Sequence, residues 1–95
     1  MAQLGYRVMD TQIFNLGLSL EANSAYIVVC SLMEDGLRAG LETVAARWNG
    51  TPETLAAALK ELAAWRVVEP RRDSGEDPFY APNPASLWRR PGQPG

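Results

Sequence analysis

The sequence contains no histidine and a single cysteine, and both facts restrict its chemistry. Without histidine there is no imidazole base, no Ser–His or Cys–His nucleophile pair and no His-ligated metal. Cys30 alone cannot form a disulfide within the chain or build a zinc site of the usual kind. Its position in an apolar segment favours a buried structural thiol over a reactive one. We therefore expect no enzyme, no cofactor and no metal site.

Long hydrophobic runs are also missing. The longest largely apolar stretch, residues 25–33, is far shorter than the roughly 20 residues that cross a bilayer. Residues 1–6 do not combine a basic patch with an apolar stretch, as a signal peptide does. The default expectation is a cytoplasmic protein with no membrane partner. The chain of 95 residues, 46% of them hydrophobic, suits one globular domain over residues 1–90 and a disordered tail over 91–95.

An excess of positive charge is lacking as well, because the formal net charge is −2. Many DNA-binding domains are basic, so this sum argues mildly against a nucleic-acid partner. The distribution is more informative than the sum. Residues 51–72 carry four basic and three acidic side chains, whereas residues 1–50 and 73–95 are both net acidic.

The N-terminal segment, residues 1–18, is expected to hold an extended arm and one short helical turn. Apolar and other residues alternate over 4–8, which suggests a strand or extended arm. Asp10 can then cap a helical turn over 11–16, with Ile13 and Phe14 directed inward.

The first long helix is predicted over residues 20–34. Ser19 is a good N-cap, and Gly36 marks the end of the helix. The apolar residues cover most of the circumference, which predicts a central helix. This apolar surface exceeds what one small core needs, and the arm and the segment around Trp88 add more without evident cover. We therefore expect a homodimer.

A second helix, over about 41–48, and a third, over 52–65, are separated by the turn Asn49–Gly50. The second helix is expected to place Leu41, Val44, Ala45 and Trp48 on one face. We expect Ala45 to be small because the third helix crosses the second there. Thr51 caps the third helix and Pro52 takes its first position. The buried ridge of this helix is expected to comprise Leu55, Leu59 and Leu62.

A hairpin is predicted over residues 66–82. Val67–Pro70 forms the first strand, Phe79–Ala81 returns as the second, and the tip between them is long and polar. A last turn follows over 83–87. Three helices followed by a hairpin is the winged-helix order, so the expected fold is mainly α with a small β-hairpin, a three-helix core plus a wing.

The segment that carries the closest likeness to a family is residues 41–62, LETVAARWNGTPETLAAALKEL, together with the lead-in YRVMDTQIFNLGLS at 6–19. It resembles the winged helix-turn-helix domains of bacterial and phage replication initiators and of small transcriptional regulators. This resemblance implies a third helix that reads the major groove and a hairpin that touches phosphates or the minor groove. It implies DNA contacts by Thr51, Glu53, Thr54, Ala56, Ala57 and Lys60, and by Arg71 and Arg72 on the wing.

The expected function is therefore a sequence-specific double-stranded DNA-binding protein, a transcriptional regulator or a replication, plasmid or phage accessory factor. Two features depart from the family. Ala56 and Ala57 stand where basic or amide side chains are common, and the tip carries the acidic residues Asp73, Glu76 and Asp77. Such a protein would bind DNA weakly, or would rely on a dimer and on its basic residues, Arg47, Lys60, Arg66, Arg71 and Arg72. The alternative is a winged-helix module that has lost DNA binding and binds a partner protein instead.

Overall fold

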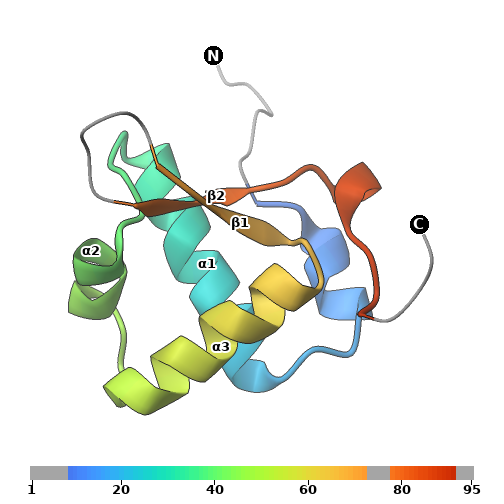
Figure 1. Ribbon diagram of the computed structural model, residues 1–95, viewed down its shortest axis with the longest axis horizontal. Helices are drawn as coiled ribbons and strands as arrows, with labels where there is room; N and C mark the ends of the chain where they lie inside the picture. Colours follow the sequence, from blue (N-terminus) through green and yellow to red (C-terminus); the bar gives the residue numbers. More distant parts are fainter. Residues whose placement is uncertain (1–8, 73–77, 92–95) are drawn as a thin grey trace.

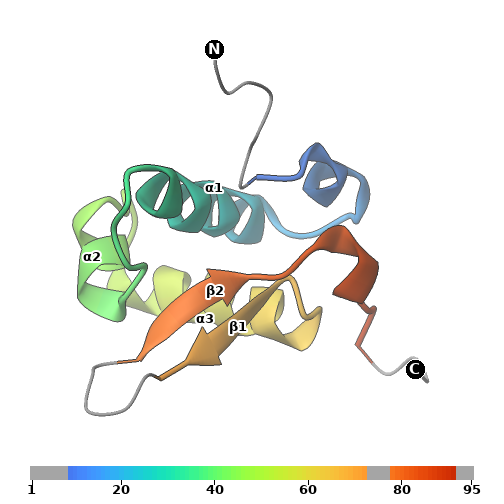
Figure 2. The same cartoon turned by 90° about the horizontal axis from the view of Figure 1, so that it is seen from above.

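The computed structural model describes residues 9–72 and 78–91. Its elements in chain order are the 3-10 helix η1 (Thr11–Asn15), the helices α1 (Leu20–Glu34), α2 (Leu41–Ala46) and α3 (Pro52–Ala64), the strands β1 (Val68–Arg71) and β2 (Phe79–Pro82), and the 3-10 helix η2 (Ala85–Leu87). Figures 1 and 2 show α1 running behind the hairpin, with α2 at one end of the domain and the C-terminal segment at the other. The predicted three-helix core plus wing is confirmed. The predicted arm at 4–8, the hairpin tip at 73–77 and the end of the tail at 92–95 lie outside the described residues.

The helices begin where the capping residues predict. The Ser19 hydroxyl accepts a hydrogen bond from the Ala22 N–H (3.1 Å), and the Thr51 hydroxyl accepts one from the Thr54 N–H (3.2 Å). Pro52 occupies the first turn of α3, where its missing N–H leaves no carbonyl without a partner. Each cap satisfies an N–H that the helix itself cannot, so local chemistry sets both starting points.

Both long helices end in the same backbone motif, in which a left-handed residue reverses the chain. At the end of α1 this residue is Gly36, with φ +76°. At the end of α3 it is Arg66, with φ +61°, and the following Val67 N–H donates to the Leu62 carbonyl at 2.9 Å. A side chain in this conformation costs about 1 kcal/mol. Arg66 therefore stands where glycine is the usual residue.

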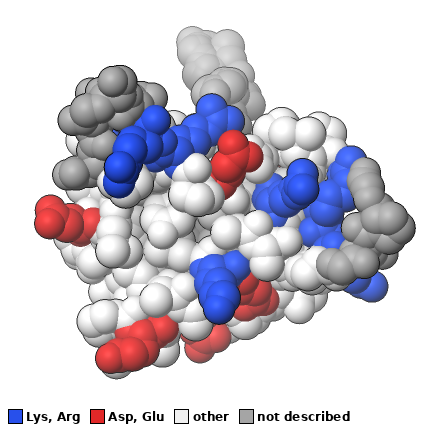
Figure 3. Space-filling view, in the orientation of Figure 1, with Lys and Arg blue, Asp and Glu red and all other residues white. Residues whose placement is uncertain are grey.

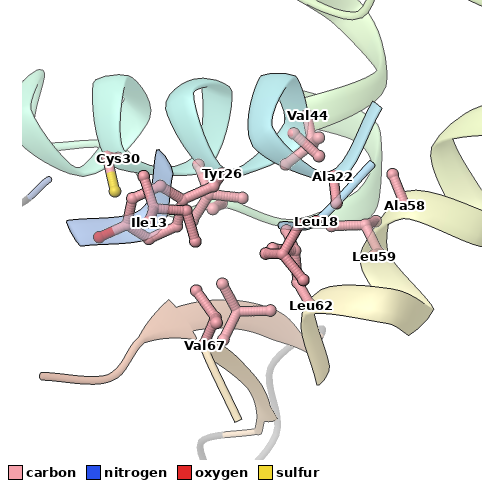
Figure 4. Packing of buried hydrophobic residues seen from close by; sticks show 14 of the residues in the cluster. Ile13, Leu18, Ala22, Tyr26, Cys30, Val44, Ala58, Leu59, Leu62 and Val67 are labelled. Carbon is pink, nitrogen blue, oxygen red and sulfur yellow. The ribbon is translucent and has the colours of Figure 1, made fainter. Parts of the chain in front are cut away.

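The core lies between α1 and α3 and is closed by the first residues of β1. Figure 4 shows Tyr26 of α1, Leu59 and Leu62 of α3, and Val67 directed into one apolar cluster. The predicted ridge of α3 is buried throughout, with exposed fractions of 2% for Leu55, 3% for Leu59 and 0% for Leu62. Burial of this ridge on α1 accounts for the position of α3, since apolar area removed from water is the main stabilising term.

The C-terminal segment completes the core. Trp88 is 8% exposed, its ring meets Tyr26 edge to face at 6.0 Å, and its Nε1–H donates to the Asn83 carbonyl at 2.9 Å. The expectation that the Trp88 segment leaves apolar surface uncovered is therefore wrong. The indole is buried because both its apolar rings and its single donor find partners.

The hairpin is antiparallel, pairing Val68 with Pro82 and Arg71 with Phe79. Its second strand also contacts the connection between α1 and α2. Gly40 and Phe79 form an isolated antiparallel bridge, and the Tyr80 N–H donates to the Ala39 carbonyl at 2.9 Å. The hairpin is thus bound to the core on the side of β2, a topology consistent with a winged helix.

Two packing predictions are wrong. The face of α2 is not buried as a whole: Val44 is fully buried, but Leu41 is 58% exposed and Ala45 is exposed. This six-residue helix contacts α1, so the small size of Ala45 is not required by a crossing of α3. In η1, Ile13 is buried but Phe14 is 49% exposed, because adjacent residues of a 3-10 turn point in different directions.

Candidate nucleic-acid interface

The face of α3 opposite its buried ridge is uncovered by the described residues. Glu53, Ala56, Ala57 and Lys60 are all exposed on it. In Figure 1 this helix runs along the lower edge of the domain, below the hairpin. The structure therefore brings four of the predicted site residues onto one surface. The side chains of Ala56 and Ala57 on that surface are short, and its single positive charge is on Lys60.

The two predicted threonines serve the turn before α3. The Trp48 Nε1–H donates to the Thr54 hydroxyl (3.2 Å), which donates to the Thr51 carbonyl (2.9 Å). Gly50 permits this contact, because a Cβ there would lie 2.7 Å from both Trp48 Nε1 and Thr54 Oγ1. Both hydroxyls are thus occupied inside the protein. This arrangement stabilises the turn between α2 and α3 and leaves the two hydroxyls little capacity to bind a ligand.

The predicted basic residues differ in how far their charges are already compensated. The Arg47 guanidinium binds Asp35 Oδ2 at 3.0 Å and the Ser31 hydroxyl at 3.1 Å, both at the end of α1. Arg71 lies 3.5 Å from Glu69 on the same strand. Within residues 9–72 and 78–91, no ion pair is seen for the other three predicted basic residues, Lys60, Arg66 and Arg72.

Positive charge is not gathered into one continuous patch on this side of the molecule. Figure 3 shows Lys and Arg in separate groups, near the hairpin, over α3 and beside the C-terminal segment. Acidic atoms lie between these groups and where α3 begins. A partner with a regular array of negative charges would therefore meet the C-terminal half of α3 more favourably than its N-terminal half.

The buried titratable groups are structural. Cys30 is 1% exposed, and burial raises the pKa of its thiol to about 12. Burial also raises the pKa of the Tyr26 phenol, whose oxygen accepts a hydrogen bond from the Asp10 N–H at 2.9 Å. At neutral pH both groups are protonated, so the buried thiol predicted from the sequence is confirmed.

Three structural contributions were not anticipated from the sequence. The Glu61 carboxylate accepts hydrogen bonds from the backbone N–H and the hydroxyl of Ser19. The Asn83 amide donates to the Arg66 carbonyl at 2.9 Å and so stabilises the left-handed turn after α3. Arg89 and Arg90 lie close to Trp65, at the end of α3. The adjacent pair of arginines was the only signal visible in the sequence.

Other kinds of site find no support in the described part of the chain. Over residues 9–72 and 78–91, no three Cys, Asp or Glu side chains come together as metal ligands. None of the helices in those ranges is both long and apolar enough to span a membrane. Comparison of the chain with protein-family models, curated proteins and solved structures finds no match.

Proposed function

We propose that this domain binds duplex DNA, with the exposed face of α3 toward the major groove and the hairpin along the phosphate backbone. The observation that carries the proposal is the uncovered, low surface of α3 at Ala56 and Ala57, next to Lys60. A helix with short side chains can approach the floor of the groove closely, and a methyl group can contact the thymine methyl. Lys60 and the hairpin arginines Arg71 and Arg72 supply charges for phosphates.

The expected affinity follows from the number of uncompensated cations. Non-specific binding grows with the number of phosphates neutralised, and few basic groups per copy predict weak, micromolar-range binding. A sequence-specific regulator or replication accessory factor would need more contacts than one copy provides. A second copy would double the number of basic groups available.

The surface available for a homodimer is the outward face of α1. Leu20 is 76% and Ile27 42% exposed, and Ser24 lies between them at helical spacing. Sedimentation equilibrium at tens of micromolar should report a dimer for the wild type and a monomer for Ile27→Asp. A monomeric wild type would contradict this part of the proposal.

DNA binding can be tested by fluorescence anisotropy with a labelled random duplex at several salt concentrations between about 50 and 200 mM. Lys60→Ala should weaken binding and reduce the slope of log K against log salt by about one. The matched control is Arg47→Ala, which removes the same charge at a site where Asp35 already compensates it. Equal effects of the two variants would show that net charge matters rather than the α3 face.

A partner protein is the second candidate function, and one feature favours it. A groove of about 430 Å³ lies between α1 and the turn before α3, lined by Leu20, Val28 and Trp48 among others. With a sequence pI near 5.0, the domain also lacks the general attraction to nucleic acid that a basic protein has. No salt-dependent association of the wild type with duplex DNA would favour this candidate over the first.

A further inference from the structure

Three arginines meet where α3 ends, outside the surface just described. Arg66 directly follows the last turn of α3, the Arg89 N–H donates to the Trp65 carbonyl at 2.8 Å, and the Arg90 guanidinium lies 5.8 Å from the centre of the Trp65 ring. All three side chains are exposed. We call Arg66, Arg89 and Arg90 the C-terminal arginine cluster. Figure 3 shows a group of basic side chains beside the C-terminal segment.

The backbone under the cluster is held to the core by buried groups. Asn83 is 7% exposed; its amide donates to the Arg66 carbonyl, and its own carbonyl accepts from the Trp88 indole. Arg89 Nη1 donates to the carbonyls of Ser86 and Trp88, at 3.0 and 2.8 Å. The backbone of Arg66 and Arg89 and the side chain of Arg89 are therefore held by the fold, which reduces the entropy lost when the cluster binds a ligand.

The cluster concentrates positive charge in a chain whose net charge is −2. The negative end of the α3 dipole favours one cation in this region. The helix dipole does not account for three arginines. Two of them, Arg89 and Arg90, come from a segment more than twenty positions after Arg66 in the chain. Among the acidic residues of the hairpin, Glu69 is already paired with Arg71. A local excess of guanidinium groups of this kind suits a ligand with repeated negative charges.

We propose that the C-terminal arginine cluster binds the phosphodiester backbone of nucleic acid. This inference rests on the proposed function and moves the main DNA contact toward the C-terminal end of α3. Lys60 and the cluster are two separate basic groups toward the C-terminal end of α3, whereas the N-terminal half carries Glu53 and threonines whose hydroxyls are occupied. DNA is therefore contacted mainly by the end of α3 and the segment after the hairpin, with the hairpin arginines as a second, weaker contact.

The test compares Arg89→Ala/Arg90→Ala with the wild type in the duplex titration described above. The expected result is about a tenfold loss of affinity and a salt slope smaller by about two units. The charge-preserving variant Arg89→Lys/Arg90→Lys should keep the slope. Arg47→Ala, which removes an arginine already paired with Asp35, is the control and should change the slope by less than about half a unit. Thermal melting verifies that each variant is folded.

The outcomes separate this inference from the proposed function. If the wild type binds duplex DNA and Arg89→Ala/Arg90→Ala binds it with the same affinity and salt slope, the cluster has no role, but the proposal of DNA binding stands. No binding of duplex DNA by the wild type overturns the proposed function and this inference together. The last comparison uses vesicles that contain phosphatidylserine. If the wild type binds these vesicles but not DNA, and Arg89→Ala/Arg90→Ala abolishes vesicle binding, the ligand of the cluster is an anionic lipid surface and not nucleic acid.

Discussion

The Glu61 carboxylate holds Ser19 at two points: Oε2 accepts from the backbone N–H at 3.0 Å and Oε1 accepts from the hydroxyl at 2.6 Å. Ser19 in turn caps α1 through the Ala22 N–H. A residue of α3 thereby stabilises the beginning of α1, although 42 positions separate the two in the chain. The contact couples a local capping motif to the packing of the two longest helices.

We expect Glu61→Ala to lower the free energy of unfolding by about 1–2 kcal/mol. The Ser19 hydroxyl still caps α1 in this variant, but the Ser19 N–H and hydroxyl lose the carboxylate that accepts their hydrogen bonds. Partial exposure of the pair keeps the effect at the lower end of that range. Urea denaturation measures it. Lys60→Ala is the neighbouring control and should change stability by less than about 0.5 kcal/mol. If Glu61→Ala behaves like this control, the contact contributes nothing to stability.

The ridge of α3 predicts a large effect at Leu59, which is 3% exposed in the centre of the core. Leu59→Ala should lower the free energy of unfolding by about 2–5 kcal/mol, a large share of the stability of a small domain. Leu41→Ala, at an exposed leucine of α2, is the matched control. Similar midpoints for the two variants in denaturant would show that the packing of α3 on α1 is incorrect.

Stability should fall in alkaline solution because burial raises the pKa of both Tyr26 and Cys30. Above about pH 8.5 the unfolded chain loses the thiol proton that the folded protein still holds. The unfolded state then binds fewer protons, so the free energy of unfolding decreases with pH, by up to about 1.4 kcal/mol per pH unit for each group. This stability is fully present below about pH 8.5 and is lost progressively up to the folded pKa of Cys30, about 12. Cys30→Ala should show a shallower decline, and a flat profile for the wild type between about pH 8.5 and 10.5 would contradict the prediction.

The proposed contact of α3 with DNA predicts a gain of function at its short side chains. Ala56→Arg or Ala57→Arg should tighten duplex binding by about 1–3 kcal/mol where the guanidinium reaches a guanine or a phosphate. Helix propensity barely changes, so melting should be unaffected. Duplex titration and circular dichroism provide the two measurements. If both variants are folded and bind no better than the wild type, α3 does not enter the groove.

Arg66 allows stability and binding to be separated at one residue. Arg66→Gly should raise the free energy of unfolding by about 0.5–1 kcal/mol, because glycine adopts φ +61° without the clash that a side chain brings. The same change removes one charge from the C-terminal arginine cluster, so DNA binding should weaken while the midpoint in urea rises. A variant that is destabilised would show that the Arg66 side chain stabilises the turn.

The parts of this fold that follow from the sequence are those decided within a few residues. Ser19, Thr51 and Pro52 mark the starts of the long helices, and the spacing of Leu55, Leu59 and Leu62 identifies the buried face of α3. Each signal acts through a hydrogen bond or a surface pattern on its own element. Such signals need no knowledge of what packs where.

The remaining features depend on contacts between distant residues. A glutamate at the position of Glu61 is typical of a solvated helix face, and only the fold shows that Ser19 lies beside it. Trp88 appears uncovered in the sequence because its partners, Tyr26 and the Asn83 carbonyl, come from other segments. Arg66 at a position typical of glycine gives no local signal, since the Asn83 amide that supports its carbonyl is 17 positions away. The same reason explains why Arg89 and Arg90 were not assigned to the site.

Tyr26 is contacted from both ends of the described chain, by the Asp10 N–H at its phenol oxygen and by Trp88 at its ring. The first and last turns of the domain consequently share one anchor. Local opening of either turn exposes part of the same phenol, so the two should detach as one cooperative unit rather than fray independently. Backbone amides of η1 and of residues 87–89 should then exchange with solvent deuterium at matching rates, and Tyr26→Phe should accelerate both.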